Sequence, residues 1–383
     1  MFILTTLLSL LAFTAAAPSK SGGSKDAYFY KGHDLSSLKL LEDAGNFHYV
    51  DTARNNVTRA ADDILGDGGM NGVRLRLWVN PSDGVYGLDY NLNLAKRFQS
   101  KGYRLYLDFH FADSWADPQK QPIPAAWPTE LKPLSQTLRK YVRDTLIAFK
   151  KAGINLDIVS LGNEIRHGFL WPTGYVDIDI QPYHALVKNF TNVATLYKAA
   201  RAGVDDAVAK GFNRPKQIMI HLDNGWNTTF QTRWYSALFD NGVKTSDVDA
   251  FGVSFYPFYG TSATLDNLRD SLNTLAKKYG KPVQVAETDY PAICDGQYNP
   301  IPESSEPEIP YNVDGQVEWM GKVIDVVQSV PKGLGQGVWY WEPTWLNNTS
   351  LGSNCTDALL FYPDYSKWPE TTGYSRKSVN FYK

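Results

Sequence analysis

Two glutamates stand at the ends of apolar segments of the sequence, and together they offer the carboxyl pair that cleavage of an acetal bond requires. Glu164 follows the apolar run 156–161 in SLGNEIRHG, and Glu287 ends the run 283–286 in VAETDYP. One carboxyl group can protonate the oxygen that leaves a glycosidic bond while a second acts at the anomeric carbon. Taken singly, each glutamate could equally cap a loop or form a salt bridge. Asn163 favours the catalytic interpretation, because its amide can hydrogen-bond the 2-hydroxyl group of a sugar held beside the acid.

The segments that must position these glutamates are short apolar runs alternating with longer amphipathic stretches. Strands are predicted at 27–31, 72–77, 103–109, 156–161, 217–222, 250–255, 283–286 and 337–340. Several of these runs lack alternation, as expected for parallel strands that are covered on both faces. Apolar residues at helical spacing predict helices within 134–149, 186–204 and 317–327.

Eight strands with intervening helices predict an α/β fold, a TIM (β/α)8 barrel that forms a single domain. A doubly wound open sheet is the alternative, but no G-x-G-x-x-G follows an early strand. Residues 341–383 show no helical pattern, so we expect the last helix to be missing or atypical and the tail to pack as an extended loop.

Active residues of such barrels lie at the carboxyl ends of the strands, which defines a set of further candidates. These are Asp108, His110, Asp113, Trp115, Asn163, His221, Tyr256, Trp341 and Trp345. Strands four and seven lie on opposite sides of the barrel mouth, so the two glutamates can face each other across a cleft. We favour an ion pair between Asp108 and an arginine inside the barrel. His110 and His221 could equally be neutral core residues or contacts to substrate.

Seven blocks in barrel order resemble one family of clan A barrel hydrolases. They are KGHDLSSL, RLRLWVNP, LDFHFADSWADP, SLGNEIRHGFLWP, GVSFYPFYG, VAETDYP and GVWYWEP. Together they resemble glycoside hydrolase family 53, the endo-β-1,4-galactanases that act on arabinogalactan and on the galactan side chains of pectin. The resemblance implies a retaining double displacement with Glu164 as acid/base and Glu287 as nucleophile. Their carboxyl groups should then be about 5–5.5 Å apart, whereas a separation near ~9 Å would indicate inversion.

The resemblance also implies supporting roles around the two glutamates. Asn163 would contact the 2-hydroxyl group, and Tyr256 would hydrogen-bond the nucleophile. Arg76 would lie beneath the site and keep the nucleophile ionised by its positive charge. Arg74 has the same inward-facing parity and is the alternative. The residues that would shape the substrate side of the cleft are Asp108, His110, Asp113 and Trp115, with Trp341 and Trp345 as a stacking wall.

Composition agrees with a carbohydrate substrate and disfavours nucleic acid or a membrane as partner. The formal net charge of −2 supplies no basic field for nucleic acid or an anionic membrane. The 11 Trp, 23 Tyr and 18 Phe exceed what a core alone needs, and Tyr and Trp suit a cleft that stacks sugar rings. No H-E-x-x-H, Cys/His cluster or EF-hand pattern is present, so we expect no metal and no cofactor. The expected partner is a polysaccharide, bound by a monomer.

The first residues indicate an extracellular protein. Residues 1–17 are predicted to be a cleaved signal peptide, 18–26 a flexible lead-in, and 27–383 the catalytic barrel. The N-x-[ST] candidates for glycosylation are Asn56, Asn189, Asn227, Asn347, Asn348 and Asn354. Cys294 and Cys355 are the two cysteines, for which one disulfide is favoured over two buried thiols.

Two alternative functions stay open on the sequence. The first keeps the fold and mechanism but changes the polymer to mannan, glucan or xylan. The second is a carbohydrate-binding barrel without catalysis, which the presence of both strand-end glutamates disfavours.

Overall fold

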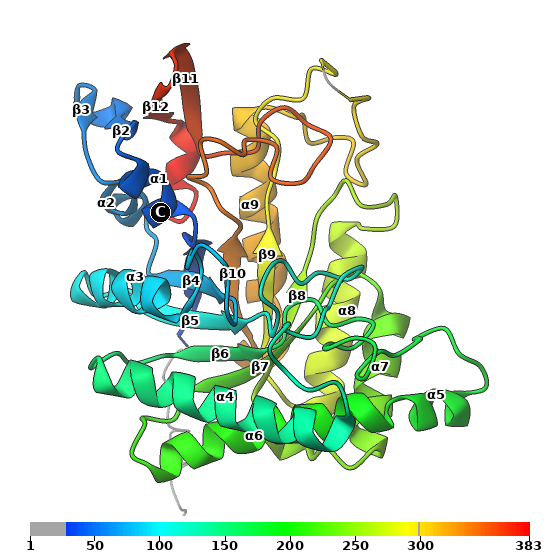
Figure 1. Cartoon of the computed structure of the whole chain (residues 1–383). Coiled ribbons are helices and arrows are strands. Elements are labelled where there is room, and N and C mark those ends of the chain that lie inside the picture. Colours follow the sequence, from blue (N-terminus) through cyan, green and yellow to red (C-terminus); the bar gives the residue numbers. More distant parts are fainter. Residues whose placement is uncertain (1–27, 298) are drawn as a thin grey trace, which may run out of the picture.

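Eight parallel strands close into a barrel in the computed structural model, which describes residues 28–297 and 299–383 (Figure 1). In barrel order they are β1 (Tyr30–Asp34), β10 (Gly335–Tyr340), β9 (Val283–Thr288), β8 (Ala250–Ser254), β7 (Gln217–Leu222), β6 (Ile158–Leu161), β5 (Arg104–Phe109) and β4 (Gly72–Leu77). The predicted TIM barrel is therefore confirmed, and all eight predicted strands correspond to barrel strands. The predicted signal peptide and lead-in lie outside the described residues.

Helices follow the strands and cover the outside of the barrel. They are α1 (Leu38–Ala44), α2 (Ala61–Asp67), α3 (Leu88–Ser100), α4 (Leu131–Lys151), α5 (Tyr183–Asn189), α6 (Thr191–Ala209), α7 (Thr228–Asp240), α8 (Leu265–Tyr279) and α9 (Val313–Gln328). The helical pattern at 186–204 belongs to two helices. Phe190, a buried residue, lies between them as the C-cap of α5 and the N-cap of α6. Among the described residues, no helix is both long and apolar enough to cross a membrane.

The tail after β10 corrects one expectation. No α-helix lies within the described residues 341–383, as predicted, but the tail is not an extended loop. It forms β11 (Phe361–Lys367) and β12 (Glu370–Ser375), followed by a 3-10 turn over Lys377–Asn380. β12 pairs in parallel with β2 (Phe47–Asp51), which in turn pairs with β3 (Val57–Thr58), so a second, four-stranded sheet lies beside the barrel. This pairing joins a segment near the start of the described chain to one near its end, which no local pattern reveals.

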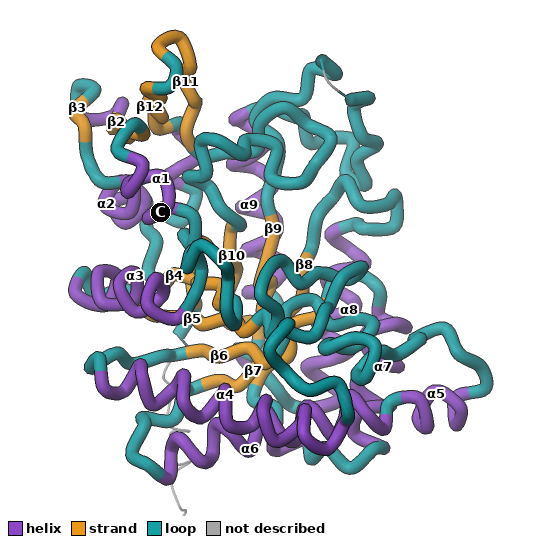
Figure 2. Tube along the Cα trace, in the orientation of Figure 1, coloured by secondary structure: helices purple, strands orange, loops and turns teal. Residues whose placement is uncertain are grey.

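The interior of the barrel has an apolar end and a polar end. Tyr30, Tyr106 and Trp339 fill the apolar end with four smaller side chains. Gly32 allows this packing, because a Cβ atom there would lie 1.9 Å from a ring carbon of Trp339. The polar end contains buried charged side chains near the carboxyl ends of the strands, where long loops follow β5, β6, β9 and β10 (Figure 2). The barrel thus places a rigid apolar base beneath a polar mouth.

Candidate active site

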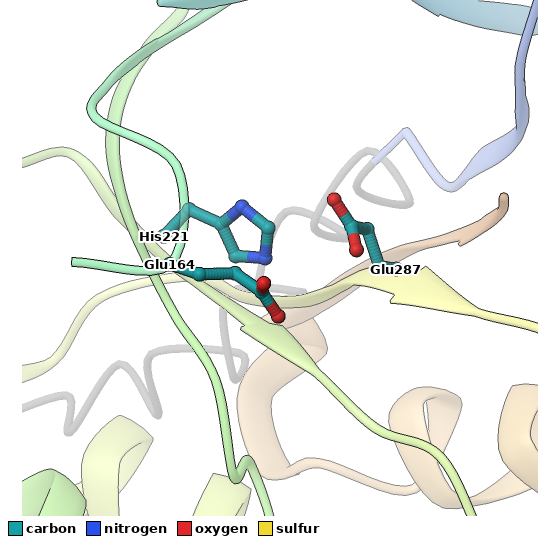
Figure 3. Close-up of side chains that lie close together, drawn as sticks. All are labelled: Glu164, His221 and Glu287. Atoms are coloured by element: carbon teal, nitrogen blue, oxygen red, sulfur yellow. The ribbon is translucent and has the colours of Figure 1, made fainter. Parts of the chain in front are cut away.

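Glu164 and Glu287 approach each other across the mouth of the barrel. Glu287 is the second-last residue of β9 and is buried, whereas Glu164 follows β6 and is partly exposed. Glu164 has a φ of 48°, a left-handed conformation that is uncommon for a side-chain-bearing residue and concentrates at functional sites. One carboxylate oxygen of each glutamate and a ring nitrogen of His221 all lie within 4.8 Å of one another (Figure 3). This proximity fits a retaining pair, since inverting pairs stand about 6.5–9.5 Å apart.

Two polar side chains contact the carboxyl group of Glu287. Arg74 Nη2 lies 2.6 Å from one of its oxygens, and the Tyr256 hydroxyl donates a 3.0 Å hydrogen bond to the other. Burial raises the pKa of Glu287 above its ordinary value and the negative charges of Asp108 and Asp34 add to this, whereas Arg74 and the Tyr256 hydrogen bond oppose the shift. The expected contact of Tyr256 is therefore present. The arginine in contact with Glu287 is Arg74, which the sequence left as the alternative to Arg76.

Arg76 was predicted to lie beside Glu287, and the structure shows this assignment to be wrong. The Arg76 guanidinium pairs instead with Glu342, a fully buried residue just after β10. Both arginines point into the barrel from β4, but their partners differ because they lie at different levels of the strand. Arg74 is paired with Tyr106 across the sheet and Arg76 with Asp108, one layer nearer the mouth.

The Arg74 guanidinium forms ion pairs with two further acids besides Glu287. It contacts Asp34 at 2.8 Å and Asp108 at 2.7 Å, and it donates a 2.9 Å hydrogen bond to the Asn163 side-chain oxygen. Burial alone would raise the pKa of Asp108, but Arg74 and His110 hold it below its ordinary value. The expected ion pair of Asp108 with an arginine is thus present. Asn163 also donates to the Ala116 carbonyl, which fixes its amide at the edge of the site.

Burial and neighbouring carboxyl groups both act on the pKa of Glu164. Burial raises its pKa well above the ordinary value, and the negative charges of Glu287 and Asp223 raise it further. A hydrogen bond from Ser254 opposes this shift. Burial also raises the pKa of Asp223 to about 7, although Arg166 lies 3.1 Å from it. The direction of these shifts favours a proton on Glu164, as a general acid requires.

Both candidate histidines, His110 and His221, are buried. His221 contacts Ser254 Oγ at 2.9 Å, and burial lowers its pKa to about 3. His110 lies 3.3 Å from Asp108, and burial lowers its pKa as well. His110 nevertheless lines one of the cavities described below, so it has a surface that a ligand can reach. Glu164, His221 and Glu287 are also spaced to hold a metal ion, but a cation there would compete with the proton that Glu164 carries.

Two adjoining cavities meet at Glu164, and we name each after a tryptophan that lines it. The Trp226 cavity, of 580 Å³, is lined by Arg166, Asp223, Asn224, Trp226 and Ser254, among others. The Trp341 cavity, of 440 Å³, is lined by Glu287, His110, Asn163 and the tryptophans Trp115, Trp341 and Trp345. Both are lined by Asp117, Glu164, Tyr256 and Tyr259. Glu164 thus stands where a bound chain would pass from one cavity into the other.

Three tryptophans form one wall of the Trp341 cavity. The rings of Trp115 and Trp345 stack at 6.0 Å between centroids, and Trp341 meets each of them edge-on at 6.2 and 6.4 Å. We call these three residues the tryptophan wall. Asp113, which we expected on the substrate side, is not among the described residues that line the two cavities. It accepts hydrogen bonds from the backbone of Asn80 and Ala125, and so it joins two loops.

The loops after β9 and β10 are joined by a disulfide between Cys294 and Cys355, which confirms the favoured pairing. The loop after β10 also accepts a 3.0 Å hydrogen bond from Tyr259 at the Gly352 carbonyl. Leu351 and Gly352 line the Trp341 cavity, so the disulfide fixes part of its rim.

Sequence reasoning missed several residues of the site. Asp34 and Ser254 were not singled out, although each is the last residue of a barrel strand, and the partner of the strand-end residue Glu342 was not predicted. Strand-end position was the available signal. What distinguishes these residues is their pairing with Arg74, His221 and Arg76, which comes from distant parts of the chain.

Known proteins of one family match this chain over nearly its whole length. Residues 30–379 match the family model of glycosyl hydrolase family 53. An arabinogalactan endo-beta-1,4-galactanase from Humicola insolens is 43% identical over 339 residues, which are 87% of this chain and 95% of that protein. A solved structure from a study of two fungal beta-1,4-galactanases is 41% identical, with a TM-score of 0.82 over 93% of this chain and 99% of that one. The family 53 catalytic domain of Ignisphaera aggregans is 27% identical, with a TM-score of 0.75, and the match covers 94% of this chain and 97% of that one.

Proposed function

Since this chain belongs to glycosyl hydrolase family 53 and is a glycoside hydrolase, we propose that it cleaves β-1,4-galactan within the chain, by a retaining double displacement. The observation that carries the mechanism is the pair of carboxyl groups with oxygens within 4.8 Å of each other, one of which is in contact with an arginine. An arginine lies against Glu287, whereas burial and neighbouring negative charges favour a proton on Glu164. The choice of galactan is supported by the activity for which the Humicola insolens relative is named.

In the first step, Glu287 attacks the anomeric carbon of the sugar in the Trp341 cavity. The bond from that carbon to the glycosidic oxygen breaks, and Glu164 gives its proton to the leaving oxygen. The sugar is then esterified to Glu287, and the leaving chain departs from the Trp226 cavity. In the second step, a water molecule attacks the same carbon and gives a proton to Glu164. The ester bond to Glu287 breaks at the same time.

The proximity of the two carboxyl groups also explains how Glu164 can serve as acid and then as base. While Glu287 is ionised, its negative charge raises the pKa of Glu164. Formation of the ester removes that charge, so the pKa of Glu164 falls and the carboxylate can accept the proton of water.

Cleavage within a polymer is supported by the cavities on both sides of Glu164. Each has the volume for sugar units, and the tryptophan wall offers apolar ring faces for stacking. Binding of sugar units on both sides of the cut is what cleavage within a chain requires.

The test is a panel of galactan, arabinogalactan, mannan, glucan and xylan, assayed with the wild type and with Glu287→Gln. Release of reducing ends from the galactans alone, lost in the variant, would support the proposal. NMR of the first product should show the β-anomer before mutarotation, because two inversions restore the configuration. An α-anomer would refute the mechanism, and preference for mannan, glucan or xylan would refute the substrate. Binding without hydrolysis of any polymer would indicate the non-catalytic alternative.

We also propose that the protein is secreted. The disulfide between Cys294 and Cys355 favours an oxidising compartment, and the sequon residues Asn56, Asn347 and Asn354 are exposed. Mass spectrometry of culture medium should find a mature chain that lacks residues 1–17. Recovery of the intact chain from the cytosol alone would contradict this.

A further inference from the structure

Arg76, which does not contact the nucleophile, lies against the tryptophan wall. Its guanidinium carbon is 4.6 Å from the ring centroid of Trp115, 5.2 Å from that of Trp345 and 4.1 Å from that of Tyr86. Trp115 comes from the loop after β5 and Trp345 from the loop after β10, so one cation contacts aromatic rings from two separate loops. Only 1% of the Arg76 side chain is exposed, and cation–π attraction strengthens when the cation is desolvated.

Glu342 contacts both the Arg76 guanidinium and the loop after β10, which carries Trp341 and Trp345. It is fully buried, it pairs with Arg76, and it accepts hydrogen bonds from the Ser37 backbone at 3.0 Å and the Ser37 hydroxyl at 2.9 Å. It lies between Trp341 and Trp345, and its backbone carbonyl accepts a 3.2 Å hydrogen bond from the Trp345 amide. Its φ of 43° is left-handed, and such a conformation persists only where surrounding contacts hold it.

The two arginines of β4 therefore contact different parts of the site. Arg74 lies 2.6 Å from Glu287, whereas Arg76 pairs with Glu342 beneath the wall. Asp34 stands between them, 2.8 Å from Arg74 and 3.6 Å from Arg76. A change at Arg76 or Glu342 thus leaves the two direct partners of the nucleophile, Arg74 and Tyr256, in place.

We infer that Arg76 and Glu342 are positioning residues for substrate binding, which act by fixing Trp115 and Trp345 as a single stacking wall for the sugars in the Trp341 cavity. The ligand is a pyranose chain, whose apolar ring faces stack on tryptophan. Glu342 compensates the buried charge, and Arg76 supplies the flat cation on which the rings pack. This inference rests on the proposed function, because the wall has a role only if a polysaccharide occupies the cavity.

The experiment compares kcat and KM of the wild type, Glu342→Gln, Arg76→Met and the double variant, on the polysaccharide that the panel identifies. KM should rise about tenfold in each variant, as expected for loss of a desolvated cation–π contact, while kcat stays within about twofold. Quenching of tryptophan fluorescence by the same polysaccharide, measured in a Glu287→Gln background, should show the same loss of affinity. The double variant leaves no unpaired buried charge, so it tests the inference even if Glu342→Gln fails to fold.

A matched control is Asp62→Asn. Asp62 is fully buried on α2, on the outside of the barrel, and contacts Arg97 at 2.6 Å and Lys101 at 2.7 Å. Breaking this cluster should lower the melting temperature and leave KM unchanged, which separates loss of stability from loss of the wall.

Three results would overturn the inference. The first is an unchanged KM in the single variants, and the second is a fall in kcat without a rise in KM. The third is a wild-type KM in the double variant, because it would mean that Arg76 and Glu342 only balance each other's charge. A wild type that neither cleaves nor binds any polysaccharide would overturn the proposed function and this inference together. A wild type that cleaves galactan while the variants keep its KM would overturn this inference alone.

Discussion

We expect the hydrogen bond from Tyr256 to Glu287 to influence the acid limb of the pH dependence, and Tyr256→Phe removes that bond alone. The Tyr256 hydroxyl donates to Oε2 of Glu287 at 3.0 Å, while Arg74 holds Oε1 at 2.6 Å. The bond favours the ionised carboxylate, so its loss raises the pKa of the nucleophile. Because Glu287 must be ionised to act as the proposed nucleophile, activity should then be lost at a higher pH as the solution is acidified.

The size of the shift follows from the type of bond. A hydrogen bond to a charged group contributes about 1.5–3 kcal/mol, and one pKa unit corresponds to about 1.4 kcal/mol. The acid limb of the variant should therefore move upward by about 1–2 pH units. Arg74 remains in contact with Glu287, so the carboxylate still ionises and activity persists above the shifted limb.

The assay is the pH dependence of kcat/KM on galactan, which reports the ionisations of the free enzyme. Tyr259→Phe is the matched control, because its ring lies 5.4 Å from that of Tyr256 but its hydroxyl donates to the Gly352 carbonyl. The control should keep the wild-type acid limb. An acid limb that stays in place or moves downward in Tyr256→Phe would refute the assignment of Glu287 as the ionised partner.

Three further outcomes follow from the same contacts. Glu287→Gln removes a negative charge beside Glu164, so the pKa of Glu164 measured by NMR titration should fall; a pKa that stays or rises would contradict the coupling. Replacing Cys294 and Cys355 by serine should lower the melting temperature, since closure of a loop across 61 residues is worth up to about 4 kcal/mol; an unchanged melting temperature would show that the loops are held by other contacts. Arg74→Lys keeps a positive charge but loses the planar fork that serves three carboxylates, so kcat should fall about tenfold or more; wild-type kcat would mean that charge alone suffices.

The sequence alone predicted the barrel strands and the two glutamates, and the reason is local. Parallel strands covered on both faces must be apolar along their length, so 217–222 and the other runs were recognisable without any partner. A barrel of parallel strands also brings every strand's carboxyl end to one mouth. For that reason Glu164 and Glu287 could be placed in one site before their distance was known, and so could Tyr256.

Only the tertiary structure decided which arginine meets the nucleophile and how the tail folds. Arg74 and Arg76 share one strand and one inward-facing parity, so a sequence pattern cannot separate them. The choice depends on the level of each arginine in the barrel and on carboxylates from β9 and the loop after β10. β12 likewise could not be paired with β2 from local pattern, because strand pairing is settled by contacts that form only when distant segments of the chain meet. Periodicity determines which face of a segment is buried, but the partner on that face is determined by the folded chain.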